Sequence, residues 1–160
     1  MIIKSKLTER DFINANFVLL YSKTATKIFT AIISIFLIIS ILTFFLIPNN
    51  SYIQVIPIAV MFSALPLLTY FTSKKNYSDN QRLSETIEYQ FDKDNLLMQG
   101  ESFNAQLTWD KVYKVTQTKN WILIWQNRQF ANPIPKRDIP EEQIKNLKII
   151  LNQYRIKNNL

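Results

Sequence analysis

The sequence IFTAIISIFLIISILTFFLI, residues 28–47, decides the fold of this chain. An α-helix of this length is about 30 Å long, which is the thickness of the hydrocarbon core of a bilayer. Such a helix would be apolar on every face, whereas helices of soluble proteins rarely remain so over this length. The stretch is also longer than the apolar region of a signal peptide and begins late in the chain. We therefore predict a transmembrane helix rather than a buried core helix or a cleaved leader.

A second apolar stretch, residues 53–71, predicts a second transmembrane helix. It contains Pro57 and Pro66, which membrane helices tolerate when Ser or Thr hydroxyls and neighbouring helices supply substitute hydrogen bonds. Residues 48–51, Pro-Asn-Asn-Ser, have the composition of a tight turn. Residues 49–51, Asn-Asn-Ser, also match the N-glycosylation motif, but we interpret these residues as part of the turn. Residues 28–71 are thus expected to form a helical hairpin.

The charged residues predict the orientation of this hairpin. All 19 basic and 12 acidic residues lie outside residues 28–71, and basic residues flank both predicted helices. Because positively charged flanks stay cytoplasmic, we expect a multi-pass membrane protein with both termini in the cytoplasm.

The composition excludes several classes of chemistry. The chain has no Cys and no His, which excludes disulfides, thiol catalysis, histidine triads and zinc fingers. Its single glycine, Gly100, excludes Rossmann and Walker loops. Asp92 and Asp94 fall in a predicted turn, where Asp favours local backbone hydrogen bonds. No catalytic residue, metal ligand or cofactor site is predicted, and the protein is not expected to be an enzyme.

The N-terminal piece, residues 1–27, is expected to be structured. Residues 2–7 could form a strand, and Thr8 is a candidate N-cap for a helix with acidic residues in its first turn. Phe12, Ala15 and Leu19 follow at helical spacing. This helix could lie on the membrane, dock on the C-terminal domain or run into the first transmembrane helix, and the sequence leaves these three alternatives open.

The C-terminal piece, residues 72–160, changes to a strand pattern. Short runs rich in β-branched and aromatic residues are separated by turn residues, which predicts an antiparallel meander. Pro140 and two glutamates then begin a helix whose inner stripe is Ile144, Leu147, Lys148, Leu151 and Tyr154. Six strands capped by one helix are typical of a pleckstrin-homology-like α+β domain, and residues 2–7 would help to complete its sheet. The predicted strands are residues 86–91, 96–99, 103–108, 112–118, 121–126 and 129–134.

Several motifs carry a resemblance to a known family. They are Leu7-Thr8-Glu9-x-Asp11-Phe12, Lys74-Lys75, Trp109-Asp110-x-Val112, Trp121-Ile122-Leu123-Ile124 and Ile134-Pro135-Lys136-Arg137. Together with the two predicted transmembrane helices, they resemble the bacterial YcxB-like family over almost the whole chain. The resemblance implies a two-span protein of the bacterial cytoplasmic (inner) membrane with a cytoplasmic pleckstrin-homology-like C-terminal domain, and it implies no particular activity.

Basic side chains are the first candidates for a binding site. From Thr72 onward the chain has 14 basic and 10 acidic residues, so the C-terminal domain is moderately positive. Basic residues held near an anionic bilayer each contribute about 1 kcal/mol of attraction. A mixed, solvated surface is the alternative interpretation, and Lys74 and Lys75 could simply fix the topology. The candidates for binding headgroups or a partner are Lys74, Lys75, Lys111, Lys114, Lys119, Arg128, Lys136 and Arg137.

Tryptophans are the second candidates. Trp109 and Trp121 could anchor the domain at the membrane interface. The alternative is that at least two of Trp109, Trp121 and Trp125 belong to the core, because Trp121, Leu123 and Trp125 share one face of a strand.

These observations favour a non-enzymatic, membrane-anchored scaffold or regulator whose cytoplasmic domain binds a protein partner, anionic lipid headgroups or both. An immunity or regulatory subunit for a membrane-acting toxin or complex would have the same architecture. A small transporter or channel subunit is less favoured, because the predicted helices contain no ionisable residue. Small residues Ser34, Ser40, Ser63 and Ala64 make a homo-oligomer plausible. No nucleic-acid motif is visible.

Overall fold

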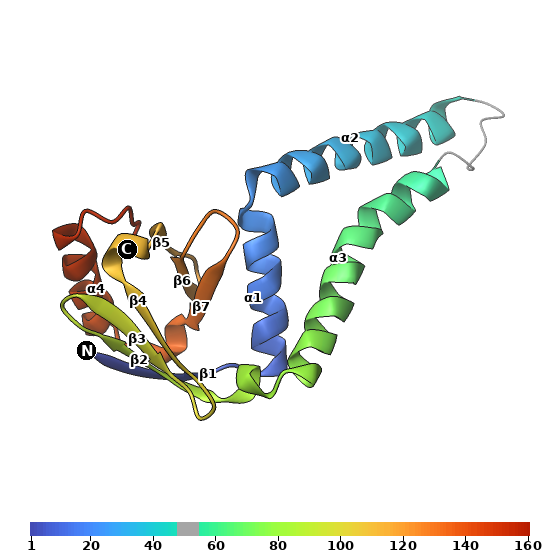
Figure 1. Ribbon diagram of the computed structural model, residues 1–160. Helices are drawn as coiled ribbons and strands as arrows, with labels where there is room; N and C mark the ends of the chain where they lie inside the picture. The colour runs from blue at the N-terminus through green and yellow to red at the C-terminus, as the bar shows by residue number, and fades with distance from the viewer. Residues whose placement is uncertain (48–54) are drawn as a thin grey trace.

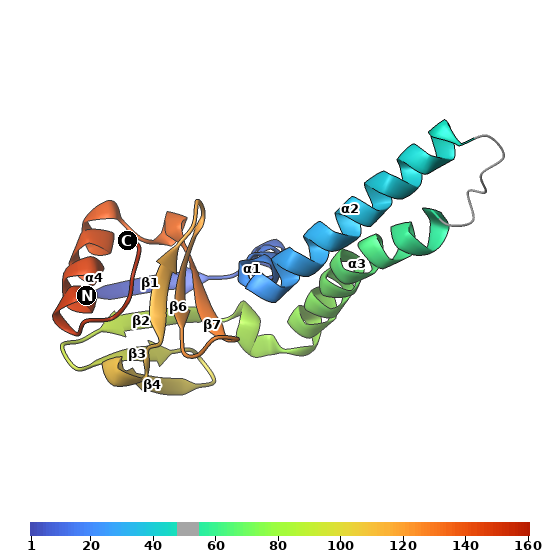
Figure 2. The ribbon, with the colours of Figure 1, turned by 90° about the horizontal axis from the view of Figure 1, so that it is seen from above.

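The computed structural model describes residues 1–47 and 55–160. A body of strands and one helix lies at one end, and two long helices project from it as a pair (Figures 1 and 2). The predicted turn at residues 48–51 and the beginning of the second predicted transmembrane helix lie outside the described residues.

The two projecting helices are α2 (Thr24–Leu46) and α3 (Val55–Asp79). Both are long and apolar enough to cross a membrane. Almost none of the residues in their apolar stretches are buried within the protein, in contrast to the core helix of a soluble domain. Pro66 lies inside α3, and the Thr69 hydroxyl near it donates to the Leu65 carbonyl (2.8 Å).

The first helix, α1 (Glu9–Ser22), confirms the predicted N-cap. The Asp11 backbone N–H donates to the Thr8 hydroxyl, and the Thr8 backbone N–H donates to the Asp11 carboxylate, which together form a capping box. Helix α1 ends at an extended residue, Lys23, from which α2 begins in a new direction (Figure 1).

The strands form two antiparallel sheets where the sequence predicted one continuous meander. The first sheet has the order β1-β2-β3-β4 and the second β5-β6-β7. They separate after β4 because a 3-10 turn at Trp109–Lys111 interrupts the extended chain. The strands are β1 (Ile2–Lys6), β2 (Thr86–Phe91), β3 (Asn95–Gln99), β4 (Asn104–Thr108), β5 (Lys114–Gln117), β6 (Trp121–Trp125) and β7 (Ala131–Pro135).

The N-terminal strand completes the first sheet, as predicted. Strand β1 pairs antiparallel with β2, with Ile3 opposite Tyr89. Ile3 is 2% exposed and belongs to the main core. Residues on opposite sides of the apolar hairpin in the sequence therefore fold as one domain.

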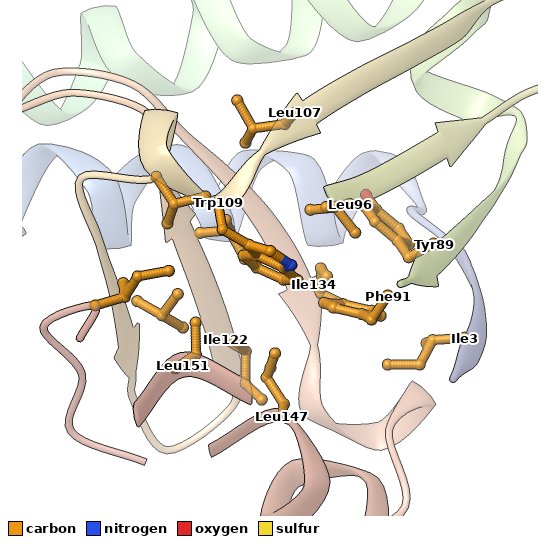
Figure 3. Packing of buried hydrophobic residues seen from close by; sticks show 14 of the residues in the cluster. Ile3, Tyr89, Phe91, Leu96, Leu107, Trp109, Ile122, Ile134, Leu147 and Leu151 are labelled. Atoms are coloured by element: carbon orange, nitrogen blue, oxygen red, sulfur yellow. The ribbon is translucent and has the colours of Figure 1, made fainter. Parts of the chain in front are cut away.

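The main core lies between the two sheets and the C-terminal helix α4 (Glu141–Gln153). Leu147 and Leu151 of α4 are fully buried against it, whereas Lys148, which the sequence placed on the inner stripe, is exposed because α4 presents only a narrow apolar face. Trp109 lies in the middle of this cluster (Figure 3). Its ring stacks with Phe91 and Tyr154, and its indole N–H donates to the Asp92 carbonyl (3.1 Å).

A second, smaller core joins α1 to the outer face of β6. Trp121, Leu123 and Trp125 point to this face, as their spacing predicted, and Ala15 of α1 is buried against them. The sequence left three alternatives for α1, and the structure shows the one in which α1 docks on the C-terminal domain. Because α2 begins directly after α1, this docking fixes where the long helices leave the domain.

Candidate functional site

A wide groove of about 1240 Å³ runs along one side of α1. We call it the basic groove. One wall is the face of α1 from Arg10 to Ser22, with Lys27 of α2 beyond it. The opposite wall comes from residues 118–121, which form the turn before β6 and its first residue, and from residues 135–137 at the end of β7 and just after it.

Five basic side chains and one carboxylate line this groove. The carboxylate belongs to Asp11 and is paired with Arg137. The other four cations, Arg10, Lys27, Lys119 and Lys136, form no ion pair within residues 1–47 and 55–160. The polar residues Tyr21, Thr118 and Asn120 also line the walls, and the Thr118 hydroxyl is bonded to the backbone of Trp121. The groove is thus suited to an anionic group with several hydrogen-bond acceptors.

The ion pair between Asp11 and Arg137 holds the two walls together. Arg137 Nη1 donates to Asp11 Oδ1 (2.8 Å) and Nη2 donates to Oδ2 (2.6 Å), which is the bidentate geometry of the strongest arginine–carboxylate pairs. The Thr8 hydroxyl donates to the same carboxylate (2.7 Å). The hydrogen bonds from Arg137 hold the pKa of Asp11 well below its usual range, so this carboxylate is ionised at neutral pH.

The groove adjoins the first residues of α2. Lys27 is the last charged residue before the apolar part of that helix, which begins at the exposed residues Ile28 and Phe29. On α3, the charged residues resume at Lys74. The basic groove therefore ends where the apolar surface of the long helices starts.

The structure brings together three of the eight predicted basic residues. Lys119, Lys136 and Arg137 line the basic groove, with Arg137 committed to the ion pair. The others lie elsewhere: Lys74 and Lys75 are exposed on α3, Lys111 is exposed in the turn after β4, and Arg128 is exposed in the loop between β6 and β7. Lys114 is half-buried, with its ammonium 4.9 Å from the centre of the Trp125 ring.

Trp109 and Trp121 are not surface anchors in this structure. Trp109 is 2% exposed within the main core, and Trp121 is 5% exposed beneath α1. Their large apolar rings fill the two cores of a small domain. The prediction that Trp109 and Trp121 anchor the domain at the membrane interface is therefore corrected. Both tryptophans belong to the core, which was the alternative.

Three further residues with notable positions were not among the predicted binding residues. Arg10 and Lys27 line the basic groove, but in the sequence they belong only to the basic residues that flank the predicted helices. Phe130 is 65% exposed, and the sequence did not single it out. Lys27 could have been selected from the sequence because it immediately precedes the apolar stretch, and the first residues of a membrane helix lie at headgroup level. Phe130 stands out only as an aromatic residue beside predicted turn residues.

Within the part of the chain that the structure describes, no group of three or more Asp or Glu residues is placed to hold a metal ion. The hydroxyls of Ser34 and Ser63 on the long helices donate to carbonyls of their own helices. These residues therefore give no direct indication of a second copy of the chain.

The fold and the site together define a small α+β domain that includes its own N-terminal strand, is carried on two long apolar helices and has a basic groove at their junction. Residues 91–148, from the end of β2 into α4, match the family model described as YcxB-like protein. The match confirms the resemblance over these residues, which include the motifs that begin at Trp109, Trp121 and Ile134. Neither the comparison with curated proteins nor the comparison with solved structures gave a match.

Proposed function

We propose that the protein is a non-enzymatic, membrane-anchored binding module whose basic groove binds anionic phospholipid headgroups. Helices α2 and α3 would span the bacterial inner membrane, with both termini in the cytoplasm. The exposed apolar surface of both helices supports insertion, because so large an apolar surface is costly in water. The basic residues that flank both helices support the orientation.

The proposal includes a pleckstrin-homology-like arrangement of the domain. A sheet of four antiparallel strands, a second of three and a C-terminal helix against their common core support it. This likeness adds nothing about the ligand, since one fold serves many functions.

One observation carries the proposal: four cations without ion-pair partners in the described residues line a groove that ends where α2 becomes apolar. When α2 enters a bilayer, this end of the groove lies at headgroup level. Phosphate oxygens there would meet the positive charge and the polar side chains of Tyr21 and Asn120. A protein partner with an acidic segment is the competing occupant of the groove.

The test uses the full chain in neutral detergent micelles, titrated with short-chain phosphatidylglycerol or phosphatidylcholine, with bound lipid counted by native mass spectrometry. The groove variant is Arg10→Gln, Lys119→Gln and Lys136→Gln. The control variant is Lys93→Gln, Lys145→Gln and Lys148→Gln, which removes the same charge from exposed positions outside the groove.

We expect the natural chain and the control variant to bind phosphatidylglycerol in preference to phosphatidylcholine. At about 1 kcal/mol for each basic residue, the groove variant should bind it about a hundredfold more weakly. Equal binding by the two variants would show that net charge, not the groove, attracts the lipid. A natural chain that binds both lipids alike would overturn the headgroup proposal and favour a protein partner.

A further inference from the structure

We infer that the loop between β6 and β7 is a second membrane contact, in which Phe130 inserts into the interfacial region of the bilayer and Arg128 pairs with anionic headgroups. The inference rests on the proposed membrane insertion of α2 and α3. It does not depend on the basic groove, because Arg128 and Phe130 are not groove residues.

The loop holds its aromatic residue in a defined position. The Asn127 side-chain oxygen accepts hydrogen bonds from the backbone N–H groups of Gln129 (2.7 Å) and Phe130 (2.9 Å). The Gln126 N–H donates to the Phe130 carbonyl (3.0 Å), which closes the hairpin. Asn127 therefore builds a tight turn without glycine, and these bonds fix the backbone of Phe130 without any contact with lipid.

Phe130 is exposed although it is large and apolar. It is 65% exposed, and Tyr113, whose N–H donates to the Trp125 carbonyl one residue before the loop begins, is 47% exposed. Arg128 at the tip of the loop is exposed as well. An exposed aromatic residue and an exposed basic residue in one loop are the combination that favours the boundary between headgroups and acyl chains.

The geometry of α1 places this loop on the membrane side of the domain. Arg137, just after β7, pairs with Asp11 in the first turn of α1, so the end of β7 lies beside the start of that helix. The start of β7, Ala131, packs with the core cluster that also contacts Leu19, near the end of α1. The loop before β7 therefore lies close to the junction of α1 and α2, as Figure 1 shows.

Other exposed apolar residues of the domain lack this position. Ile149 on α4 is 64% exposed, almost as much as Phe130. However, α4 lies on the side of the domain away from α2 and α3 in both views (Figures 1 and 2). Ile149 is thus a control that is similarly exposed and apolar but lies on the side of the domain away from the proposed bilayer.

The chain contains no cysteine, so a single introduced cysteine can be labelled specifically. We would prepare Phe130→Cys, Ile149→Cys and Ile38→Cys, attach an environment-sensitive fluorophore and reconstitute each full chain into vesicles that contain phosphatidylglycerol. Quencher lipids would carry a spin label either at the headgroup or within the acyl chain. Ile38, exposed on α2, reports whether that helix is inserted.

The expected result is that the label at position 130 emits at shorter wavelength and is quenched by the headgroup spin label, whereas the label at position 149 is not. The label at position 38 should be quenched by the acyl-chain spin label. Quenching at 38 with no difference between 130 and 149 would overturn the inference and leave membrane insertion standing. Absence of quenching at 38 would overturn membrane insertion and the inference together.

Discussion

The carboxylate of Asp11 and the guanidinium of Arg137 form a bidentate ion pair between residues 126 positions apart in the sequence. Asp11 lies in the first turn of α1 and is 8% exposed, and Arg137 follows β7. Because α2 begins where α1 ends, this pair fixes the long helices to the domain together with the small apolar core under α1. The same pair removes the one acidic charge of the basic groove.

Replacing Asp11 should weaken the docking of α1. Asp11→Asn removes a charged partner of Arg137 and a member of the capping box, so we expect a loss of about 2 kcal/mol in the free energy of unfolding. Thermal unfolding of the full chain in detergent, followed by tryptophan fluorescence, measures this loss, because Trp121 and Trp125 lie beneath α1.

Glu9→Gln is the matched control for this measurement. It removes an acidic charge from the same helical turn, but Glu9 is exposed and forms no ion pair within the described residues. Glu9→Gln should lower the free energy of unfolding by only about 0.5 kcal/mol. Equal effects of the two substitutions would mean that the ion pair adds nothing beyond the charge at the start of the helix.

The ion pair also predicts a pH dependence. Arg137 holds the pKa of Asp11 below its value in the unfolded chain, so the pair stabilises the fold fully above pH about 3.9 and loses that contribution progressively as the pH falls below it. The difference in unfolding free energy between the natural chain and Asp11→Asn should therefore be constant from pH 7 to 5 and narrow below pH 4. A difference that does not change with pH would contradict the assignment of the low pKa to this pair.

The N-terminal strand should be essential for the stability of the domain. Ile3→Ala removes a side chain from the main core and should cost about 3 kcal/mol, whereas Ile2→Ala, at a position 51% exposed, should cost little. Urea unfolding of the two variants measures the contrast. For the same reason, a fragment beginning near Leu83 should be less stable than a chain that keeps β1, and equal stability would show that β1 is dispensable.

Features that depend on neighbouring residues could be predicted from the sequence. The Thr8 cap, the bounds of β2 and the shared face of Trp121, Leu123 and Trp125 all follow from spacing within a few residues. The apolar character of the two long helices follows from composition alone.

Features that depend on distant residues could not be predicted in this way. The alternation of side chains along β6 predicted that Trp121, Leu123 and Trp125 share one face of the strand. It did not predict that α1 covers this face. Lys119 and Lys136 could be selected only as members of a basic set, because folding brings Arg10 and Lys27 to the same groove from before the apolar hairpin. The division into two sheets likewise depends on how the turn after β4 packs, with Trp109 filling the space between the sheets.

The single glycine of the chain predicts a further stability effect. The Gly100 N–H donates to the Phe103 carbonyl (2.9 Å) in the turn between β3 and β4. A Cβ atom at position 100 would lie 2.5 Å from Cε1 of Phe103 and 2.6 Å from Oε2 of Glu85. Glu85 accepts hydrogen bonds from the backbone N–H and the hydroxyl of Ser102, so Gly100→Ala would disturb this turn and should destabilise the domain by about 1 kcal/mol.

The cause of this effect is crowding, and a double substitution tests it. Phe103→Leu removes the ring atoms nearest to the new Cβ, so Gly100→Ala should cost less in the Phe103→Leu background than in the natural chain. The unfolding free energies of the natural chain, the two single variants and the double variant give this coupling directly. If Gly100→Ala cost the same in both backgrounds, the need for glycine would lie in the backbone or in Glu85 rather than in contact with Phe103.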